Sequence, residues 1–96
     1  MLTIHKYVLK NEDLQKVIMP KNSSILSVQN QFEEICLWAS VDTEEEKEER
    51  TILIVGTGNP IIVLKSKKET AYFIGTVQLR QGNLVFHVFE YRKHTK

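Results

Sequence analysis

The sequence predicts an all-β protein: a single small antiparallel sandwich or barrel of about seven strands. Three observations favour this class. Short segments rich in β-branched and aromatic residues recur along the chain. Several of them alternate between two faces with the period of a strand. Glycine, asparagine and proline separate them at fairly regular intervals.

The first two predicted strands cover residues 4–9 and 14–19. In the first, even-numbered residues share one face and odd-numbered residues the other. The second also fits a helical turn, but its β-branched ending, Val17-Ile18, favours a strand, and Pro20 ends it in either case.

Residues 25–31 and 35–41 are predicted to pair as an antiparallel hairpin, because only a short connection separates them. In the first of these strands, Leu26 and Val28 are expected on one face. In the second, the odd-numbered residues form an apolar face and Trp38 lies on the opposite one.

An acidic segment, DTEEEKEER at residues 42–50, has no apolar face to dock against a core. We expect a solvated loop or one exposed helical turn, and the longest connection in the domain.

Residues 51–55 contain an unbroken apolar run that is typical of a strand buried on both faces. The run stops at Gly56-Thr57-Gly58-Asn59-Pro60, where the glycines and Asn59 allow positive φ and proline removes a backbone donor. Residues 61–64 form a further short β-branched run, which predicts another strand.

A second hairpin is predicted from residues 71–79 and 84–91, joined by a turn at 80–83. Phe73 and Val77 are expected on one face of the first strand, and Gly75 in its middle predicts a bulge or a close approach by another element. If the even-numbered residues of the second strand fill the core, its other face is an apolar stripe that another chain would have to bury. We therefore expect a homo-oligomer interface formed by Val85, His87, Phe89 and Tyr91.

Composition indicates one soluble domain over residues 1–96, with a net charge of +1 and no apolar segment long enough to span a membrane. The N-terminus lacks a signal-peptide core and Cys36 is the single cysteine, so we expect a cytoplasmic protein. The near-neutral charge disfavours nucleic-acid binding, although the tail at residues 92–96 is basic.

The loop after the buried run is a candidate anion site, because adjacent residues with positive φ can form a nest of backbone amides. It lacks the lysine of a Walker loop and the third glycine of a Rossmann loop, so a plain turn is the competing interpretation. Basic side chains could also bind an anionic ligand at this loop, although such residues are equally typical of solvated sheet edges. A tryptophan could stack on a ring of the ligand, although tryptophan is more typical of a core. The candidate ligand-binding residues are Gly56, Thr57, Gly58, Asn59, Lys65, Lys67, Arg80 and Trp38.

Catalytic and metal-binding patterns are weak. The spacing of His5, His87 and His94 does not fit a metal site, and a pair between Cys36 and His87 would lack the usual surroundings of a nucleophile. We expect no enzyme activity, no cofactor and no metal.

Several motifs together resemble a family of short proteins common in tailed-phage genomes. They are I-x-K-Y-x-L at 4–9, M-P-K at 19–21, I-L-S-V-Q at 25–29, L-W-A-x-V-D at 37–42, G-T-G-x-P-I at 56–61, Y-F-I-G-T-x-Q-L at 72–79 and G-x-L-V-F-H-V-F-E at 82–90. The resemblance spans nearly the whole chain and implies a phage-encoded protein that acts in the bacterial cytoplasm. The family is a domain of unknown function, so the resemblance implies no catalytic residues. The chain departs from the family pattern at residues 64–70 and in its basic tail.

Three hypotheses follow. The first is an oligomeric binding protein that sequesters a nucleotide-type host immune signal without turning it over. The second is a protein-interaction module that inhibits or adapts a host or phage protein through a sheet edge or the apolar stripe. The third, a nucleic-acid binder, has the least support because of the charge balance.

Overall fold

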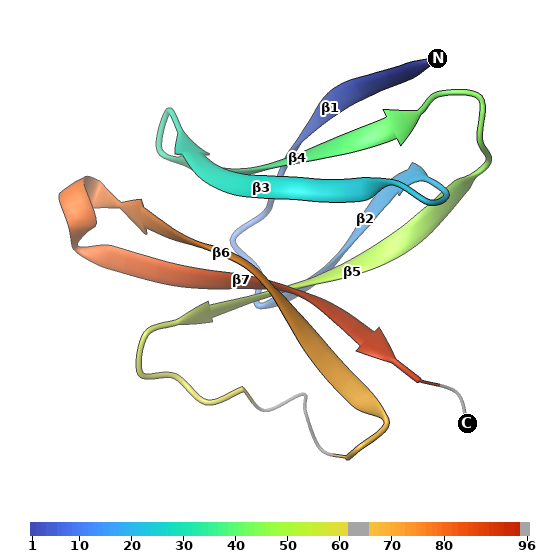
Figure 1. Ribbon diagram of the computed structural model, residues 1–96. Coiled ribbons are helices and arrows are strands. Elements are labelled where there is room, and N and C mark those ends of the chain that lie inside the picture. The colour runs from blue at the N-terminus through green and yellow to red at the C-terminus, as the bar shows by residue number, and fades with distance from the viewer. Residues whose placement is uncertain (62–65, 95–96) are drawn as a thin grey trace.

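The computed structural model describes residues 1–61 and 66–94 and contains two antiparallel sheets packed together as a sandwich (Figure 1). The three-stranded sheet has the order β1-β4-β3 and the four-stranded sheet the order β2-β5-β7-β6. The predicted all-β class is therefore confirmed. The elements are β1 (Leu2–Val8), β2 (Leu14–Pro20), β3 (Ser24–Gln31), β4 (Glu34–Asp42), β5 (Lys47–Gly56), β6 (Glu69–Leu79), the short turn η1 (Arg80–Gly82) and β7 (Leu84–Lys93).

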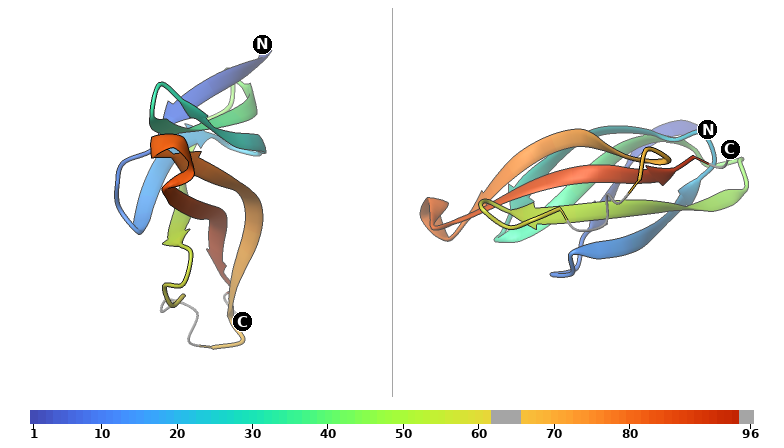
Figure 2. Two further views of the ribbon diagram at one scale, coloured as in Figure 1. Left: turned by 90° about the vertical axis from the view of Figure 1, so that its left-hand side faces the viewer. Right: turned by 90° about the horizontal axis from the view of Figure 1, so that it is seen from below.

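The chain changes sheet after β1, after β2 and after β4, whereas β5, β6 and β7 all belong to the four-stranded sheet. Both predicted hairpins are present, because β3 pairs with β4 and β6 pairs with β7. Figure 2 shows that β1 and the last part of β7 lie at opposite ends of the molecule. These two strands belong to different sheets.

The core lies between the sheets and is aliphatic. From β4, every second residue points inward, as the alternation predicted, and Leu37 and Ala39 are completely buried. Ile52 and Val88 of the four-stranded sheet are also completely buried. Burial of Leu37, Ile52 or Val88 stabilises the fold by about 1.5 to 3 kcal/mol relative to an exposed position.

A bulge in β3 overturns one prediction. The register passes from Ile25 opposite Ala39 directly to Ser27 opposite Trp38, so Leu26 is an extra residue. The extra residue shifts the alternation by one position. Leu26 is 52% exposed whereas Val28 is buried, and the expectation that they share a face was wrong.

A second bulge, in β6, has the same effect. Phe73 lies opposite Phe89, but Gly75 lies opposite Val88, so the alternation changes phase between them. Phe73 therefore faces outward and Val77 faces the core, contrary to the expectation that they share a face. The bulge itself was predicted from the glycine in mid-strand, and that prediction is confirmed.

The acidic segment 42–50 is not one long loop. Strand β4 includes Asp42 and β5 begins at Lys47, so only residues 43–46 form the turn. The prediction was wrong for the second half because β2 pairs with it, placing Val17 opposite Arg50. The basic tail is likewise partly strand, since β7 continues to Lys93. The predicted strand at 61–64 falls almost wholly outside the described residues.

Candidate functional site

The outer face of the four-stranded sheet contains an apolar row that crosses all four strands. Leu14 of β2 lies opposite Leu53 of β5, which lies opposite Phe89 of β7, which lies opposite Phe73 of β6. Leu53 is buried, but the two ends of the row are open: Leu14 is 44% exposed and Phe73 is 62% exposed. The rings of Phe73 and Phe89 meet edge to face, with their centroids 5.5 Å apart. We call these four residues the outer row.

Mostly uncharged residues border the outer row. On one side the next row contains Val55, His87 and Thr76. On the other side Thr51, Tyr91 and Ala71 lie opposite one another, and Lys16 of the edge strand β2 lies opposite Thr51 at the end of this row. The stripe predicted on β7 is therefore part of a wider surface, because Val85, His87, Phe89 and Tyr91 all lie on this face and are all half-buried.

Charge on this face lies at its margin. Lys16 of β2 and Glu49 of β5 are both more than half exposed, and their charged groups are 3.5 Å apart. An apolar centre with polar residues at its rim is the composition of protein interfaces.

His87 is held by two hydroxyl groups on the outer face. Its Nε2 is 2.7 Å from the Thr57 hydroxyl, and its Nδ1 is 3.0 Å from the Thr76 hydroxyl. A neutral imidazole can donate from one nitrogen and accept at the other, so both ring atoms are satisfied. Cys36 belongs to the other sheet, so the structure does not bring it next to His87. This geometry is that of a structural histidine.

The glycine-containing loop forms a tight turn after β5. The Asn59 N–H donates to the Gly56 carbonyl at 3.0 Å, and Gly58 has a φ of +90°, as in a type II turn. The Thr57 N–H donates to the carbonyl of Val85 at 3.1 Å. Gly58 is the one residue of this turn with positive φ, so adjacent positive-φ positions, on which the predicted anion nest depended, are absent between 56 and 59.

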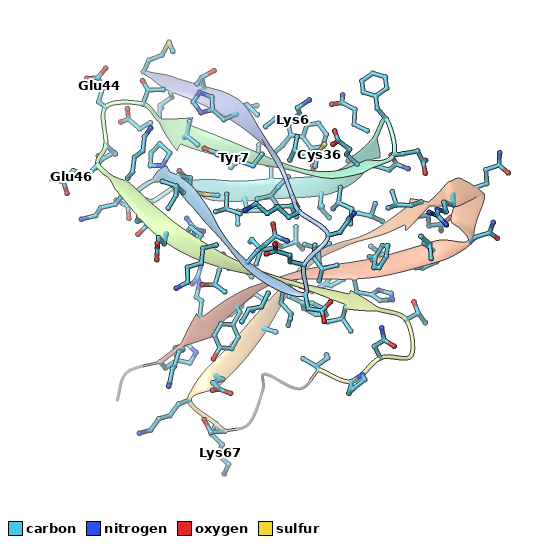
Figure 3. All side chains as sticks on the ribbon, turned by 180° about the vertical axis from the view of Figure 1, so that it is seen from behind. Lys6, Tyr7, Cys36, Glu44, Glu46 and Lys67 are labelled. Atoms are coloured by element: carbon cyan, nitrogen blue, oxygen red, sulfur yellow. The ribbon has the colours of Figure 1, made fainter. Side chains whose placement is uncertain are left out.

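The other candidate ligand-binding residues are dispersed. Lys67 precedes β6 and Arg80 follows it, and this 11-residue strand separates them by roughly 33 Å. Trp38 lies on the outer face of the three-stranded sheet, opposite Lys6. Figure 3 places Lys67 at the end of the molecule away from Lys6 and Cys36. Lys65 lies outside the described residues. A single chain therefore does not gather these side chains around one ligand.

A buried ion pair, which the sequence analysis missed, lies on the inner face of the four-stranded sheet. The Arg50 guanidinium donates from Nε and Nη2 to the two carboxylate oxygens of Glu90, and from Nη1 to the Ser23 carbonyl at 2.9 Å. The side chains of Arg50 and Glu90 are 12% and 8% exposed. The sequence contains an indication of this pair, because each of the two charged residues lies at a position that the alternation of its strand assigns to the core-facing side.

Burial raises the pKa of Glu90, but hydrogen bonds and charges from Arg50 and Arg92 outweigh it, so the net pKa is below the ordinary value. The hydrogen bond with Glu90 raises the pKa of Arg50 despite desolvation. Both charged forms are therefore favoured in the folded protein.

The same cluster borders an open groove of about 420 Å³. Arg92 donates to Glu90 at 3.2 Å, and its guanidinium lies 4.9 Å from the centre of the Tyr72 ring. Glu48 also lines the groove and lies 3.5 Å from Arg50. The carboxylates of Glu48 and Glu90 already pair with the arginines of the groove, so the groove offers an anion no free positive charge from Arg50 or Arg92.

Contacts between the two hairpin ends fix the sheets to each other. The Arg80 backbone N–H donates to the Glu33 carboxylate at 2.8 Å, and the Asn30 side chain donates to the Gln78 carbonyl at 2.8 Å. The Arg80 N–H, followed by the Asn30 side chain, lowers the pKa of Glu33. Arg80 thus has a structural role through its backbone.

The described part of the chain, 1–61 and 66–94, contains no group of three or more histidine, cysteine, aspartate or glutamate side chains suited to a metal ion. None of its helices is long and apolar enough to cross a membrane.

Fold and surface together define a small all-β sandwich protein whose four-stranded sheet has an outer face with an apolar centre and charged residues at its margin. The chain belongs to the family described as Domain of unknown function (DUF7352), whose model matches residues 1–96. No curated protein and no solved structure matches it significantly.

Proposed function

We propose that this chain is a non-enzymatic protein-interaction module and that the outer face of its four-stranded sheet docks on another protein. The outer row is the observation that supports this most strongly. Its two ends are exposed apolar side chains on a face whose centre is uncharged. Exposed apolar patches rimmed by polar residues commonly mark protein–protein interaction sites.

The polar groups near the outer row favour a protein over a small anionic ligand. Both ring nitrogens of His87 already have hydroxyl partners. The backbone N–H groups of Thr57 and Asn59 are also used within the protein. A small ligand needs several convergent donors or acceptors, whereas a protein partner can be bound largely through apolar contact.

The resemblance to short tailed-phage proteins suggests where such a module would act. We propose a phage-encoded protein that inhibits or adapts a host or phage protein in the bacterial cytoplasm. The alternative, sequestration of a nucleotide-type immune signal, would need several copies, because Trp38, Lys67 and Arg80 are dispersed in one chain. Calorimetry with cyclic dinucleotides and ADP-ribose derivatives tests the alternative, and micromolar binding that is lost in Lys67→Ala or Arg80→Ala would favour it over protein docking.

Site-specific photo-crosslinking tests the proposal. The photoreactive residue p-benzoylphenylalanine replaces Phe73 in one variant and Gln29 in a matched control. Both positions are exposed, but Gln29 lies on the three-stranded sheet. Irradiation of phage-infected cells should give a discrete adduct from position 73 and none from position 29. Absence of an adduct from position 73, or the same adducts from both positions, would contradict the proposal. The mass of the adduct distinguishes a second copy from a foreign partner.

A further inference from the structure

Within residues 1–61 and 66–94, the two sheets have four edge strands, and two of these edges cover each other. Strands β3 and β6 each contain a bulge and lie against one another, as the contact between Val28 and Gly75 and the hydrogen bond from Asn30 to Gln78 show. Bulges and coverage are common protections against pairing with another chain. The other two edges belong to β1 and β2.

The hydrogen-bond phase shows which backbone groups of these two strands point outward. In β1, the Leu9 N–H donates to the Ile35 carbonyl and the Met1 carbonyl accepts from Thr43, so the odd-numbered residues bond to β4. The even-numbered residues 2, 4, 6 and 8 therefore present their N–H and C=O groups to the free edge. By the same reasoning β2 presents residues 14, 16, 18 and 20.

Proline distinguishes the two edges. The last outward-facing position of β2 is Pro20, which has no N–H to donate. Strand β1 has neither a proline nor a bulge, and no described strand other than β4 pairs with it. Its outward-facing residues also have exposed apolar side chains: Leu2 is 77%, Ile4 is 58% and Val8 is 48% exposed. A regular edge of this kind is a template for strand addition.

We propose that β1 pairs antiparallel with β1 of a second copy, around a two-fold axis at His5, to form a continuous six-stranded sheet. In this register residue 2 lies opposite residue 8 of the second copy and residue 4 opposite residue 6, so the outward-facing backbone groups pair with one another. Leu2 then faces Val8. Lys6 faces Ile4 and not another Lys6, which avoids a like-charge pair.

A second copy suits this edge better than a foreign peptide because the strand is complementary to itself in the register that covers all its free backbone groups. The pairing involves the three-stranded sheet and leaves the outer row of the other sheet uncovered. A dimer would therefore present two copies of that surface to a partner. This inference does not depend on the proposed function.

Sedimentation analysis of the full chain tests the inference together with two substitutions of Ile4. Wild type should be a dimer of the 11.2 kDa chain. Ile4→Lys places a lysine opposite Lys6 of the second copy and should give a monomer, whereas Ile4→Glu places a carboxylate there and should remain dimeric. A monomeric wild type at its highest soluble concentration, or a dimer that Ile4→Lys leaves intact, would overturn the inference.

Disulfide formation tests the position of the axis independently. His5 would lie opposite His5 of the second copy as a non-hydrogen-bonded pair. The Cα atoms of such a pair are about 4.5 Å apart, which is within the range for a disulfide. Under mild oxidation His5→Cys should form a covalent dimer, whereas the matched Lys6→Cys variant should not. The native Cys36 is buried and does not interfere. Equal cross-linking of the two variants would contradict the register.

Discussion

Gly75 of β6 and Val28 of β3 meet where the two sheets approach each other. A Cβ atom placed on Gly75 would lie 2.9 Å from Cγ1 of Val28, closer than non-bonded carbon atoms approach. Val28 is buried and its β-branched side chain has few alternative rotamers. The absence of a side chain at Gly75 therefore allows this sheet-to-sheet spacing.

Gly75→Ala should destabilise the fold by about 1 to 3 kcal/mol, because the added methyl group overpacks the contact with Val28. The double variant Gly75→Ala/Val28→Ala should lose less stability than the sum of its two single variants, since the smaller partner makes room. Urea unfolding of all four proteins measures this coupling. If the free-energy losses of the two single variants simply add in the double variant, the contact with Val28 is not the cause of the destabilisation.

Removing one partner of the buried ion pair should be costly. Glu90→Gln should lower the free energy of unfolding by about 3 kcal/mol, because it removes the bidentate counter-charge of the buried Arg50 and leaves only the Glu48 carboxylate, 3.5 Å away. The double variant Arg50→Met/Glu90→Leu should recover most of the loss. Urea unfolding at neutral pH provides the values, and a double variant less stable than Glu90→Gln would contradict this account.

The contribution of Glu90 should also depend on pH in a defined direction. Its pKa in the folded state is lowered, so its stabilisation is present above the unfolded pKa of about 4.3 and is lost as pH falls through the folded value. The stability difference between wild type and Glu90→Gln should therefore shrink on acidification. A difference that stays constant or grows below pH 4 would be inconsistent with a lowered pKa.

Glu33 should titrate below its ordinary range because it accepts the Arg80 N–H. The amide proton shift of Arg80, followed by NMR, should report this titration with a midpoint below about 4.3. Glu33→Gln should abolish the titration while leaving the fold intact. A midpoint at or above the ordinary glutamate value would show that the contact does not persist in solution.

Phe32→Asn should stabilise the protein by about 0.5 to 1 kcal/mol. Phe32 and Glu33 form the two-residue loop between β3 and β4 with φ values of 55° and 63°, a conformation that asparagine tolerates and a bulky residue does not. The Phe32 ring is 89% exposed, so little packing is lost. Thermal unfolding compares Phe32→Asn with Phe32→Ala. The alanine variant should show no such gain in stability, because alanine also disfavours a positive φ. Destabilisation by asparagine would contradict this interpretation.

Much of the fold could be predicted because strand alternation and turn residues are local signals. The inward face of β4 and the hairpin of β6 and β7 follow directly from them. The bulge in β6 was indicated by Gly75 in mid-strand, but the bulge at Leu26 was not predicted, because a bulge depends on the partner strand as well as on its own sequence. The start of β5 was missed because its charged residues suggested solvent, whereas pairing with β2 holds them in the sheet.

The candidate site was predicted only in part. The outward phase of Val85 to Tyr91 was evident from alternation within β7. The outer row required the registers of β2, β5, β7 and β6, which one strand does not reveal. Arg50 and Glu90 lie 40 positions apart, so their pairing needed the same long-range information.

The affinity of a double variant for the cross-linked partner tests the central claim most directly. Leu14→Ser/Phe73→Ser removes the two exposed ends of the outer row, and both positions are open enough for the fold to persist. Loss of two interface anchors should weaken binding by roughly 30-fold or more, whereas Gln29→Ser should leave it unchanged. Equal affinities of wild type and the double variant, measured by calorimetry, would show that this face is not the binding surface.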